Sequence, residues 1–274
     1  MSNIDNVHSV RELHVNEIES CVAKLCVQAN IVLPEPVRGW VRGACEREPY
    51  ATAREFFTLM EHNTRIAEQE RIPICQDTGM AVVYADIGQD VHLVGGTLED
   101  AVNAGVRRGY GEGYLRKSVV SDPIRRVNTG DNTPAVLHTR LVEGHRVRLA
   151  VVPKGFGSEN MSRLKMLTPA DGMDGVRAFV VETARLAGAN PCPPMVLGVG
   201  VGGTFERVAG LAKEALAELR EGPHPDLFYA KLEDELLEEI NELASAPRDL
   251  AAARRPWQCG SKPFPRTSRV CRWR

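Results

Sequence analysis

The chain has 274 residues, of which 43% are apolar and 26% charged, and its formal net charge is −2. This composition excludes a chain that is disordered throughout. A chain of this length can bury a full apolar core, in one large domain or in two small ones. The charge does not indicate nucleic acid or an anionic membrane as a partner, and no apolar run approaches the roughly 18–20 residues that span a bilayer. Because the first residues also lack the basic and apolar regions of a secretory signal, we expect a cytoplasmic protein.

The N-terminal third is predicted to be helical. Apolar residues recur at spacings of three and four over residues 9–29, which indicates an amphipathic helix. Two further helices are expected over residues 35–48 and 51–70. Three cysteines fall in these helices, where buried thiols are the expected role: Cys21, Cys26 and Cys45.

After residue 70 the pattern changes to alternating strands and helices. The apolar run over residues 80–88 predicts a buried strand, and Thr97 is a suitable N-cap for the helix that follows. Residues 134–155 alternate on both sides of Glu143-Gly144, which predicts a β-hairpin. Two histidines of this hairpin are expected on the sheet surface rather than in catalysis: His138 and His145.

The next helix has clear boundaries, with Thr168 as N-cap, Pro169 in its first turn and Gly188 at its end. Downstream we expect, in order, a buried strand over 194–203, a helix over 205–219 and an acidic helix that continues through residue 241. The fold class is therefore α/β, in the mixed α+β sense: a helical N-terminal part followed by a mixed sheet with flanking helices.

Glycine and small polar residues cluster at the ends of four strand-like runs, a position where sites collect in α/β proteins: residues 75–79, 126–135, 153–162 and 190–203. The glycines of the last cluster do not follow the dinucleotide-binding pattern, and "KGFGSEN" lacks the spacing of a phosphate loop. The seven cysteines are too few for a disulfide scaffold and include no CxxC pair. Cys75 and Cys192 lie in these clusters. From composition alone, each of them could be either a metal ligand or a structural thiol.

Six motifs occur in a characteristic order over about residues 8–243: "PICQDTG", "GYLRKSVVSDP", "NTGDNTPA", "KGFGSEN", "NPCPP" and "GVGVGGTFE". In this order they resemble the class I fumarases, and more narrowly the alpha subunit of the two-subunit iron–sulfur hydro-lyases, a group that includes L(+)-tartrate dehydratase. The resemblance implies a 4Fe–4S cluster held by three cysteines, with one iron left free for a four-carbon dicarboxylate. It also implies a hetero-oligomer whose beta subunit supplies the proton-abstracting residues. The implied reaction is the hydration of fumarate to malate, with L(+)-tartrate dehydration as the alternative.

The resemblance assigns roles to individual residues. Cys75 and Cys192 match the first two cluster ligands, and thiolates suit iron–sulfur clusters. Gln76 and Asp77 match positions beside the substrate, with Asp77 the catalytic candidate. Arg116 matches a clamp on a substrate carboxylate, which a planar guanidinium can grip with two hydrogen bonds. The backbone around Gly157 matches a loop that faces the substrate. Two simpler interpretations stay open: Asp77 could cap its own turn, and Arg116 could be a solvated charge.

Residues 244–274 depart from this family pattern. They are rich in Arg, Pro and Trp, and they lack the glycine-rich stretch and the third cluster cysteine that the family carries at this point. Neither Cys259 nor Cys271 has the expected context. We therefore expect a domain over residues 1–243 and a disordered tail, for which a shifted reading frame beginning near Ala244 is a hypothesis. The missing cysteine favours an inactive or scaffold subunit as an alternative, whereas a hydrolase that uses Cys75 lacks a histidine in a comparable motif.

Overall fold

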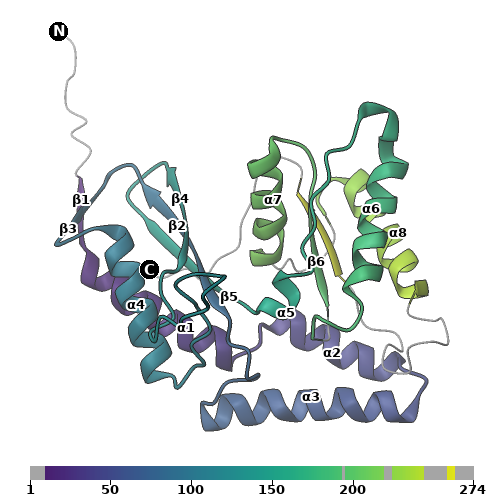
Figure 1. Cartoon of the computed structure of the whole chain (residues 1–274), viewed down its shortest axis with the longest axis horizontal. Helices are drawn as coiled ribbons and strands as arrows, with labels where there is room; N and C mark the ends of the chain where they lie inside the picture. The colour runs from purple at the N-terminus through teal and green to yellow at the C-terminus, as the bar shows by residue number, and fades with distance from the viewer. Residues whose placement is uncertain (1–9, 193–194, 219–223, 244–257, 263–274) are drawn as a thin grey trace. The chain divides into compact units, whose positions relative to one another are not determined.

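The computed structural model describes residues 10–192, 195–218, 224–243 and 258–262 (Figure 1). The described chain divides into two compact units, each of which is described by itself. Unit 1 contains residues 10–32 and 67–155, and unit 2 contains residues 33–66 and the described residues from 156 onward. The boundary between the units falls inside the "KGFGSEN" motif. The expectation of one domain over residues 1–243 stays a prediction.

Unit 1 packs two helices against a three-stranded sheet. Its elements are β1 (Arg11–His14), α1 (Val15–Ile31), β2 (Met80–Gly88), β3 (Val91–Val94), α4 (Leu98–Glu112), β4 (Val136–Val142) and β5 (Val147–Lys154). Helices α1 and α4 run side by side in Figure 1, and their apolar faces share one core with β2 and β5. Because burial of apolar area is the dominant favourable contribution to folding, this core holds the unit together.

The predicted hairpin over residues 134–155 is wrong, although both of its strands are present. The strand order is β4-β2-β5, with β4 parallel and β5 antiparallel to β2. The connection between β4 and β5 crosses the end of β2, where the backbone amide of Gly88 donates to the carbonyl of Arg146 at 2.8 Å. A Cβ atom at Gly88 would lie 2.1 Å from the Gly144 carbonyl oxygen. Strand β2, an apolar run, therefore lies at the centre of the sheet. The alternation of apolar and polar residues within β4 and β5 does not predict that another strand lies between them.

The first predicted helix begins later than expected. Residues 11–14 form β1, which pairs in parallel with β3, and α1 starts at Val15. The imidazole Nδ1 of His14 accepts a hydrogen bond from the amide of Asn16 at 3.2 Å and caps the helix. The spacing of apolar residues continues smoothly through this boundary, so the sequence pattern alone does not reveal it.

Unit 2 places helices around a parallel strand pair. Its elements are α2 (Glu35–Arg47), α3 (Ala51–Glu70, whose last turn belongs to unit 1), α5 (Phe156–Glu159), the 3₁₀ turn η1 (Pro169–Asp171), α6 (Gly172–Ala187), β6 (Val196–Gly200), α7 (Phe205–Ala217), α8 (Leu227–Leu243) and β7 (Gln258–Lys262). Helices α6 and α8 share an apolar core that includes Met195 at the start of the β6 segment. A Cβ atom at Gly198 or at Gly200 would lie 2.3 Å from a carbonyl oxygen of α7. The glycines of "GVGVGG" thus allow close packing of a helix on a strand.

The predicted mixed α/β fold and most of its helix boundaries are confirmed. The Thr97 hydroxyl accepts from the amide of Asp100 at 3.1 Å and caps α4. The Asp171 carboxylate accepts from the amide and hydroxyl of Thr168, but Thr168 caps η1, and α6 itself begins only at Gly172. Gly188 ends α6 with a φ of +49°, a conformation that glycine adopts without strain. No described helix is long and apolar enough to cross a membrane. Apart from the backbone of β7, the tail and its frameshift hypothesis lie outside the described residues.

Candidate active site

The loop of residues 75–79 leads directly into β2 and is held on both of its sides. Gly79 has a φ of +61°, and a Cβ atom there would lie 2.4 Å from the Lys154 carbonyl. The buried Thr78 hydroxyl donates to the Arg116 carbonyl at 2.8 Å. The "CQDTG" loop therefore lies between the end of β5 and the "YLRKS" segment that follows α4.

Two buried polar side chains complete this arrangement. The Asn132 amide donates to the Gly79 carbonyl at 3.0 Å and accepts from the backbone amides of Ser118 at 2.7 Å and Val119 at 3.1 Å. The Tyr110 hydroxyl donates to the Thr78 carbonyl at 2.7 Å. Burial raises the pKa of Tyr110, so this hydroxyl remains a donor.

Unit 1 thus brings parts of four motifs together: residues 75–79, 114–118, 132 and 154–155. Asn132 lies in the "NTGDNTPA" motif, but the sequence predicts no role for it, and nothing in the sequence marks Tyr110. The sequence shows Asn132 as a polar residue in a glycine-rich segment and Tyr110 as a tyrosine on an apolar helix face. Neither feature predicts which distant residue the side chain bonds to.

The predicted site residues of the "CQDTG" loop differ in exposure. Cys75 is half-buried, and its thiol donates to the side-chain oxygen of the exposed Gln76 at 3.2 Å. The half-buried Asp77 carboxylate lies over Gly155, where a Cβ atom would come within 2.7 Å of Oδ2. Among the described residues this carboxylate accepts no hydrogen bond, so the alternative in which Asp77 caps its own turn is not observed.

Arg116 is anchored through its backbone and leaves its side chain exposed. Its carbonyl accepts the Thr78 hydroxyl, whereas its guanidinium has no ion-pair partner within the described part of the chain. The structure therefore anchors the backbone of Arg116 against the "CQDTG" loop and leaves its guanidinium exposed. This geometry is compatible both with a carboxylate clamp and with a solvated charge.

The remaining two candidates lie in unit 2. Gly157 is exposed in α5, and a Cβ atom there would lie 3.0 Å from the Asn190 carbonyl oxygen. The Asn190 side-chain amide lies 3.3 Å from the Met161 sulfur, so the loop that carries the exposed Cys192 packs against the second half of "KGFGSEN". Cys75 and Cys192 belong to different units, and their convergence on one cluster stays a prediction. Within the described residues, no group of three or more His, Cys, Asp or Glu side chains could hold a metal ion.

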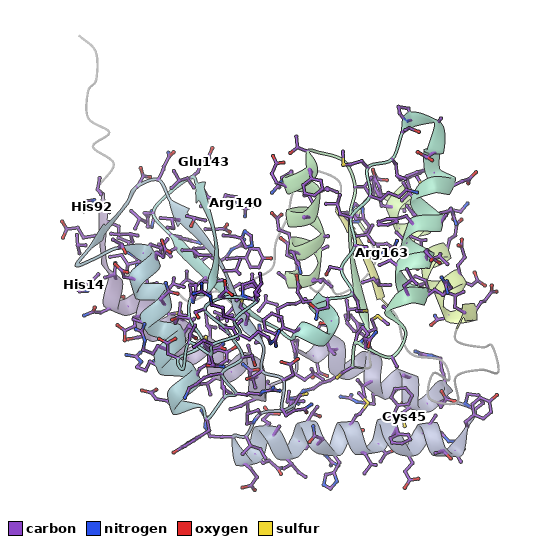
Figure 2. All side chains as sticks on the ribbon, in the orientation of Figure 1. His14, Cys45, His92, Arg140, Glu143 and Arg163 are labelled. Atoms are coloured by element: carbon purple, nitrogen blue, oxygen red, sulfur yellow. The ribbon has the colours of Figure 1, made fainter. Side chains whose placement is uncertain are left out.

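Of the three helix cysteines predicted to be buried, only Cys26 is fully so, whereas Cys21 and Cys45 are half-buried and pack against the edges of the apolar cores. Cys26 is fully buried in the core of unit 1, and this burial raises its pKa to about 12. Figure 2 shows Cys45 beside α3, where its sulfur lies 3.7 Å from the Arg54 carbonyl and 3.7 Å from the Thr58 hydroxyl. Neither thiol has the exposure of Cys192. The predicted surface positions of His138, which stacks on Tyr84, and His145 are also confirmed.

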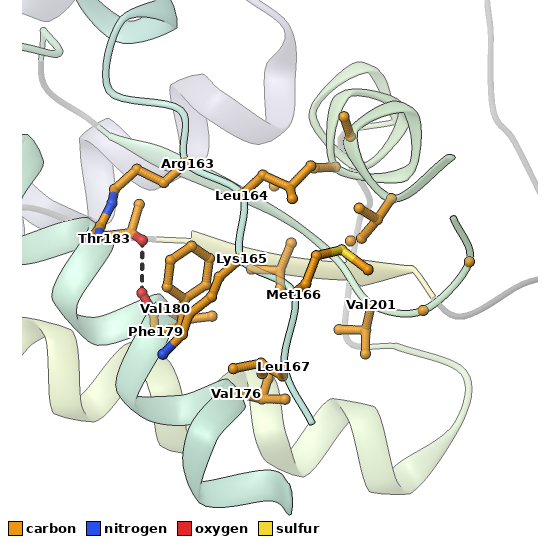
Figure 3. Close-up of a pocket in the computed structure, with 18 of the residues that line it drawn as sticks. Arg163, Leu164, Lys165, Met166, Leu167, Val176, Phe179, Val180, Thr183 and Val201 are labelled. Atoms are coloured by element: carbon orange, nitrogen blue, oxygen red, sulfur yellow. Dashed lines mark hydrogen bonds between the residues drawn. The ribbon is translucent and has the colours of Figure 1, made fainter. Parts of the chain in front are cut away.

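Unit 2 also contains a pocket of about 630 Å³ between the segment before η1, α6, β6 and α7 (Figure 3). Most of its lining is apolar, including Met166 and Phe179. The Arg163 guanidinium lies 5.2 Å from the centre of the Phe179 ring, a cation–π contact. None of the predicted site residues lines this pocket, so it is separate from the candidate site.

Comparison with known proteins identifies related chains. Residues 19–251 match a family described as fumarate hydratase (Fumerase). The chain is 38% identical over 234 residues to the putative L(+)-tartrate dehydratase subunit alpha of Methanocaldococcus jannaschii, which covers 83% of this chain and 81% of that relative. It is 28% identical over 246 residues to the L(+)-tartrate dehydratase subunit alpha of Escherichia coli strain K12, with 88% and 80% covered. All predicted site residues fall inside the matched range.

Proposed function

The chain belongs to the fumarate hydratase family, and on this premise we propose that it is the alpha subunit of an iron–sulfur hydro-lyase that works with a beta subunit. The proposed reaction is the reversible addition of water to fumarate, which gives malate. Dehydration of L(+)-tartrate is the second candidate, and the names of the relatives favour it. The observation that carries the proposal is the "CQDTG" loop, which carries a thiol, an amide and a carboxylate and is bonded to the backbone of Arg116, whose exposed guanidinium has no ion-pair partner among the described residues.

Cys75 and Cys192 would hold the cluster. The chemistry of these donors fits, because cysteine thiolates are the usual ligands of iron–sulfur clusters. Cys75 is half-buried and its thiol donates to the Gln76 side-chain oxygen, so it is accessible, whereas Cys26 is enclosed in the core of unit 1. When bound, the cluster would supply a Lewis-acidic iron that polarises the hydroxyl leaving the substrate.

The number of cluster ligands is the part of the family pattern that this sequence does not match in full. The family pattern needs a third cysteine, and the side chains of Cys259 and Cys271 lie outside the described residues. Two thiolates would hold a cluster poorly, which keeps an inactive or scaffold subunit as the alternative from another class.

The other predicted residues would bind and orient the substrate. Arg116 would grip one carboxylate of the dianion, and the Gln76 amide would donate a hydrogen bond beside it. The Asp77 carboxylate, which accepts no hydrogen bond from the described residues, would accept one from the reacting hydroxyl or water. Backbone groups around Gly157 would face the second carboxylate, and the beta subunit would remove the proton. The thiols of such a site require a reducing compartment such as the cytoplasm.

The test is a direct assay of both reactions. We expect the chain, co-expressed with its beta subunit without oxygen, to convert malate into fumarate faster than it dehydrates L(+)-tartrate. Faster turnover of tartrate would select the second candidate. A complex that contains iron and sulfide but acts on neither compound would contradict the hydro-lyase assignment.

A further inference from the structure

Residues 117–129 form a short antiparallel projection in unit 1, which we call the finger. A β-bridge joins Val120 to Asn128, and backbone hydrogen bonds of 2.8–3.0 Å join residues 119 and 121 to residues 129 and 127. At the tip, the Asp122 carboxylate accepts from the amides of Ile124 at 3.0 Å and Arg125 at 2.6 Å. The finger therefore has a defined shape that its own hydrogen bonds hold.

The finger presents apolar side chains to solvent. Ile124 at the tip is 88% exposed and Val127 beside it is 62% exposed. Tyr114, just before the base of the finger, is 92% exposed and has a φ of +52°, which is uncommon for a residue other than glycine. Tyrosine and clustered apolar side chains on a projecting surface are typical of protein–protein interfaces.

The finger and its base also carry uncompensated positive charge. Four exposed cations have no ion-pair partner within the described part of the chain: Arg116, Lys117, Arg125 and Arg126. The one carboxylate of the finger, Asp122, is committed to the backbone of the tip. Such a surface attracts a partner with carboxylates around an apolar pocket, and arginine is enriched among residues that dominate binding energy.

The base of the finger is fixed to the candidate active site. Asn132 accepts from the amides of Ser118 and Val119, and the same side chain donates to Gly79 of the "CQDTG" loop. The base of the finger is therefore connected through one side chain to the loop that carries Thr78, and Arg116 directly precedes the finger. The apolar tip does not suit a dicarboxylate, whereas it suits a protein surface.

We propose that the finger is the element through which this chain docks its beta subunit beside the active site. The tip, with Ile124 and Val127, enters an apolar pocket of the beta subunit, and Arg125 and Arg126 pair with carboxylates at the rim of that pocket. This inference rests on the proposed function, because the partner is the beta subunit of the same hydro-lyase.

The test measures the dissociation constant between the purified beta subunit and variants of the full chain at low and high salt. Ile124→Asp is expected to weaken binding at least about tenfold, as loss of an interface anchor does. The double variant Arg125→Glu/Arg126→Glu is expected to slow association about tenfold at low salt, with a smaller effect at high salt. Matched controls are Leu141→Asp on β4, where Leu141 is 74% exposed, and Arg146→Glu, which should each stay within about twofold of the native chain.

The outcomes separate the two proposals. A loss of activity in Ile124→Asp that excess beta subunit restores supports docking by the finger. If the native pair is active and the tip variants bind within twofold of the native chain, the finger is not the docking element and the proposed function stands. If the native chain and the beta subunit do not bind each other at all, the proposed function fails and this inference fails with it.

Discussion

Asn132 links three segments of unit 1 through one fully buried amide. It donates to the end of the "CQDTG" loop and accepts from two consecutive amides at the base of the finger. Its φ of +63° is also a conformation that asparagine tolerates better than most residues. One side chain therefore sets the spacing between the predicted cluster ligand and the predicted substrate clamp.

We predict that Asn132→Ala lowers the free energy of unfolding by about 2–4 kcal/mol, because two buried amides and one carbonyl lose their partner. Urea unfolding measures this change. The matched control is Asn128→Ala in the same motif, whose exposed side chain bonds to the Lys117 carbonyl and the Gly130 amide. We expect about 1 kcal/mol or less for this control. Equal losses in the two variants would contradict the central role of Asn132.

Asp131 provides a prediction about pH. The hydrogen bond from the Thr133 hydroxyl at 2.7 Å, and then the contact with Arg107 at 2.8 Å, lower the pKa of Asp131 to about 2. Since the folded pKa lies below the unfolded value of about 3.9, the contribution to stability is present above about pH 4 and is lost as the pH falls toward 2. Asp131→Asn should therefore cost about 1 kcal/mol at pH 6 and reduce the pH dependence below pH 4. Unfolding curves of the native chain and the variant at pH 6 and at several values below pH 4 check this prediction. If the free energy of unfolding of the two depends on pH in the same way, the prediction is wrong.

At the level of elements, glycines set how closely α4 approaches α1. A Cβ atom at Gly105 would lie 2.7 Å from the Glu19 carbonyl oxygen, and one at Gly109 would lie 2.6 Å from that of Ala23. Both helices contribute to the core beneath the candidate site. The α4 helix ends just before Arg116, so its packing positions that residue.

Gly105→Ala is predicted to destabilise unit 1 by about 1–3 kcal/mol, because the added methyl group forces the two helices apart. Gly111→Ala in the same helix is the control, since a Cβ atom at Gly111 meets nothing within 4 Å. Helix propensity should make the control neutral or more stable by up to about 1 kcal/mol. Thermal unfolding of both variants distinguishes packing from propensity. A stabilised Gly105→Ala would show that the helices can separate without cost.

The elements also show what the sequence could predict. Local signals located β2, α3 and the start of α4 correctly, because apolar spacing and the Thr97 cap are properties of short segments. They did not reveal that β4 and β5 lie on opposite sides of β2, or that residues 11–14 pair with β3. These facts depend on contacts between distant segments. In the site, the resemblance predicts roles for Cys75 and Arg116, whereas it does not predict the bonds of Tyr110 and Asn132 to the "CQDTG" loop, which span 31 to 53 residues.

For the whole molecule, the predicted site residues are divided between two units. Unit 1 contains Cys75, Gln76, Asp77 and Arg116, whereas unit 2 contains Gly157 and Cys192. The "KGFGSEN" motif is continuous across the boundary, with Gly155 against Asp77 and Gly157 against Asn190. Our proposal therefore needs residues of both units and a beta subunit docked on the finger.

The most direct test of the central claim is the iron and acid-labile sulfide content of the complex purified without oxygen. We predict a cluster in the native complex and in the Cys45→Ser control, and its loss in Cys75→Ser, because Cys75 is the proposed first ligand while Cys45 packs between helices. A Cys75→Ser complex that retains its full iron and sulfide would contradict the assignment of the "CQDTG" loop as the cluster site.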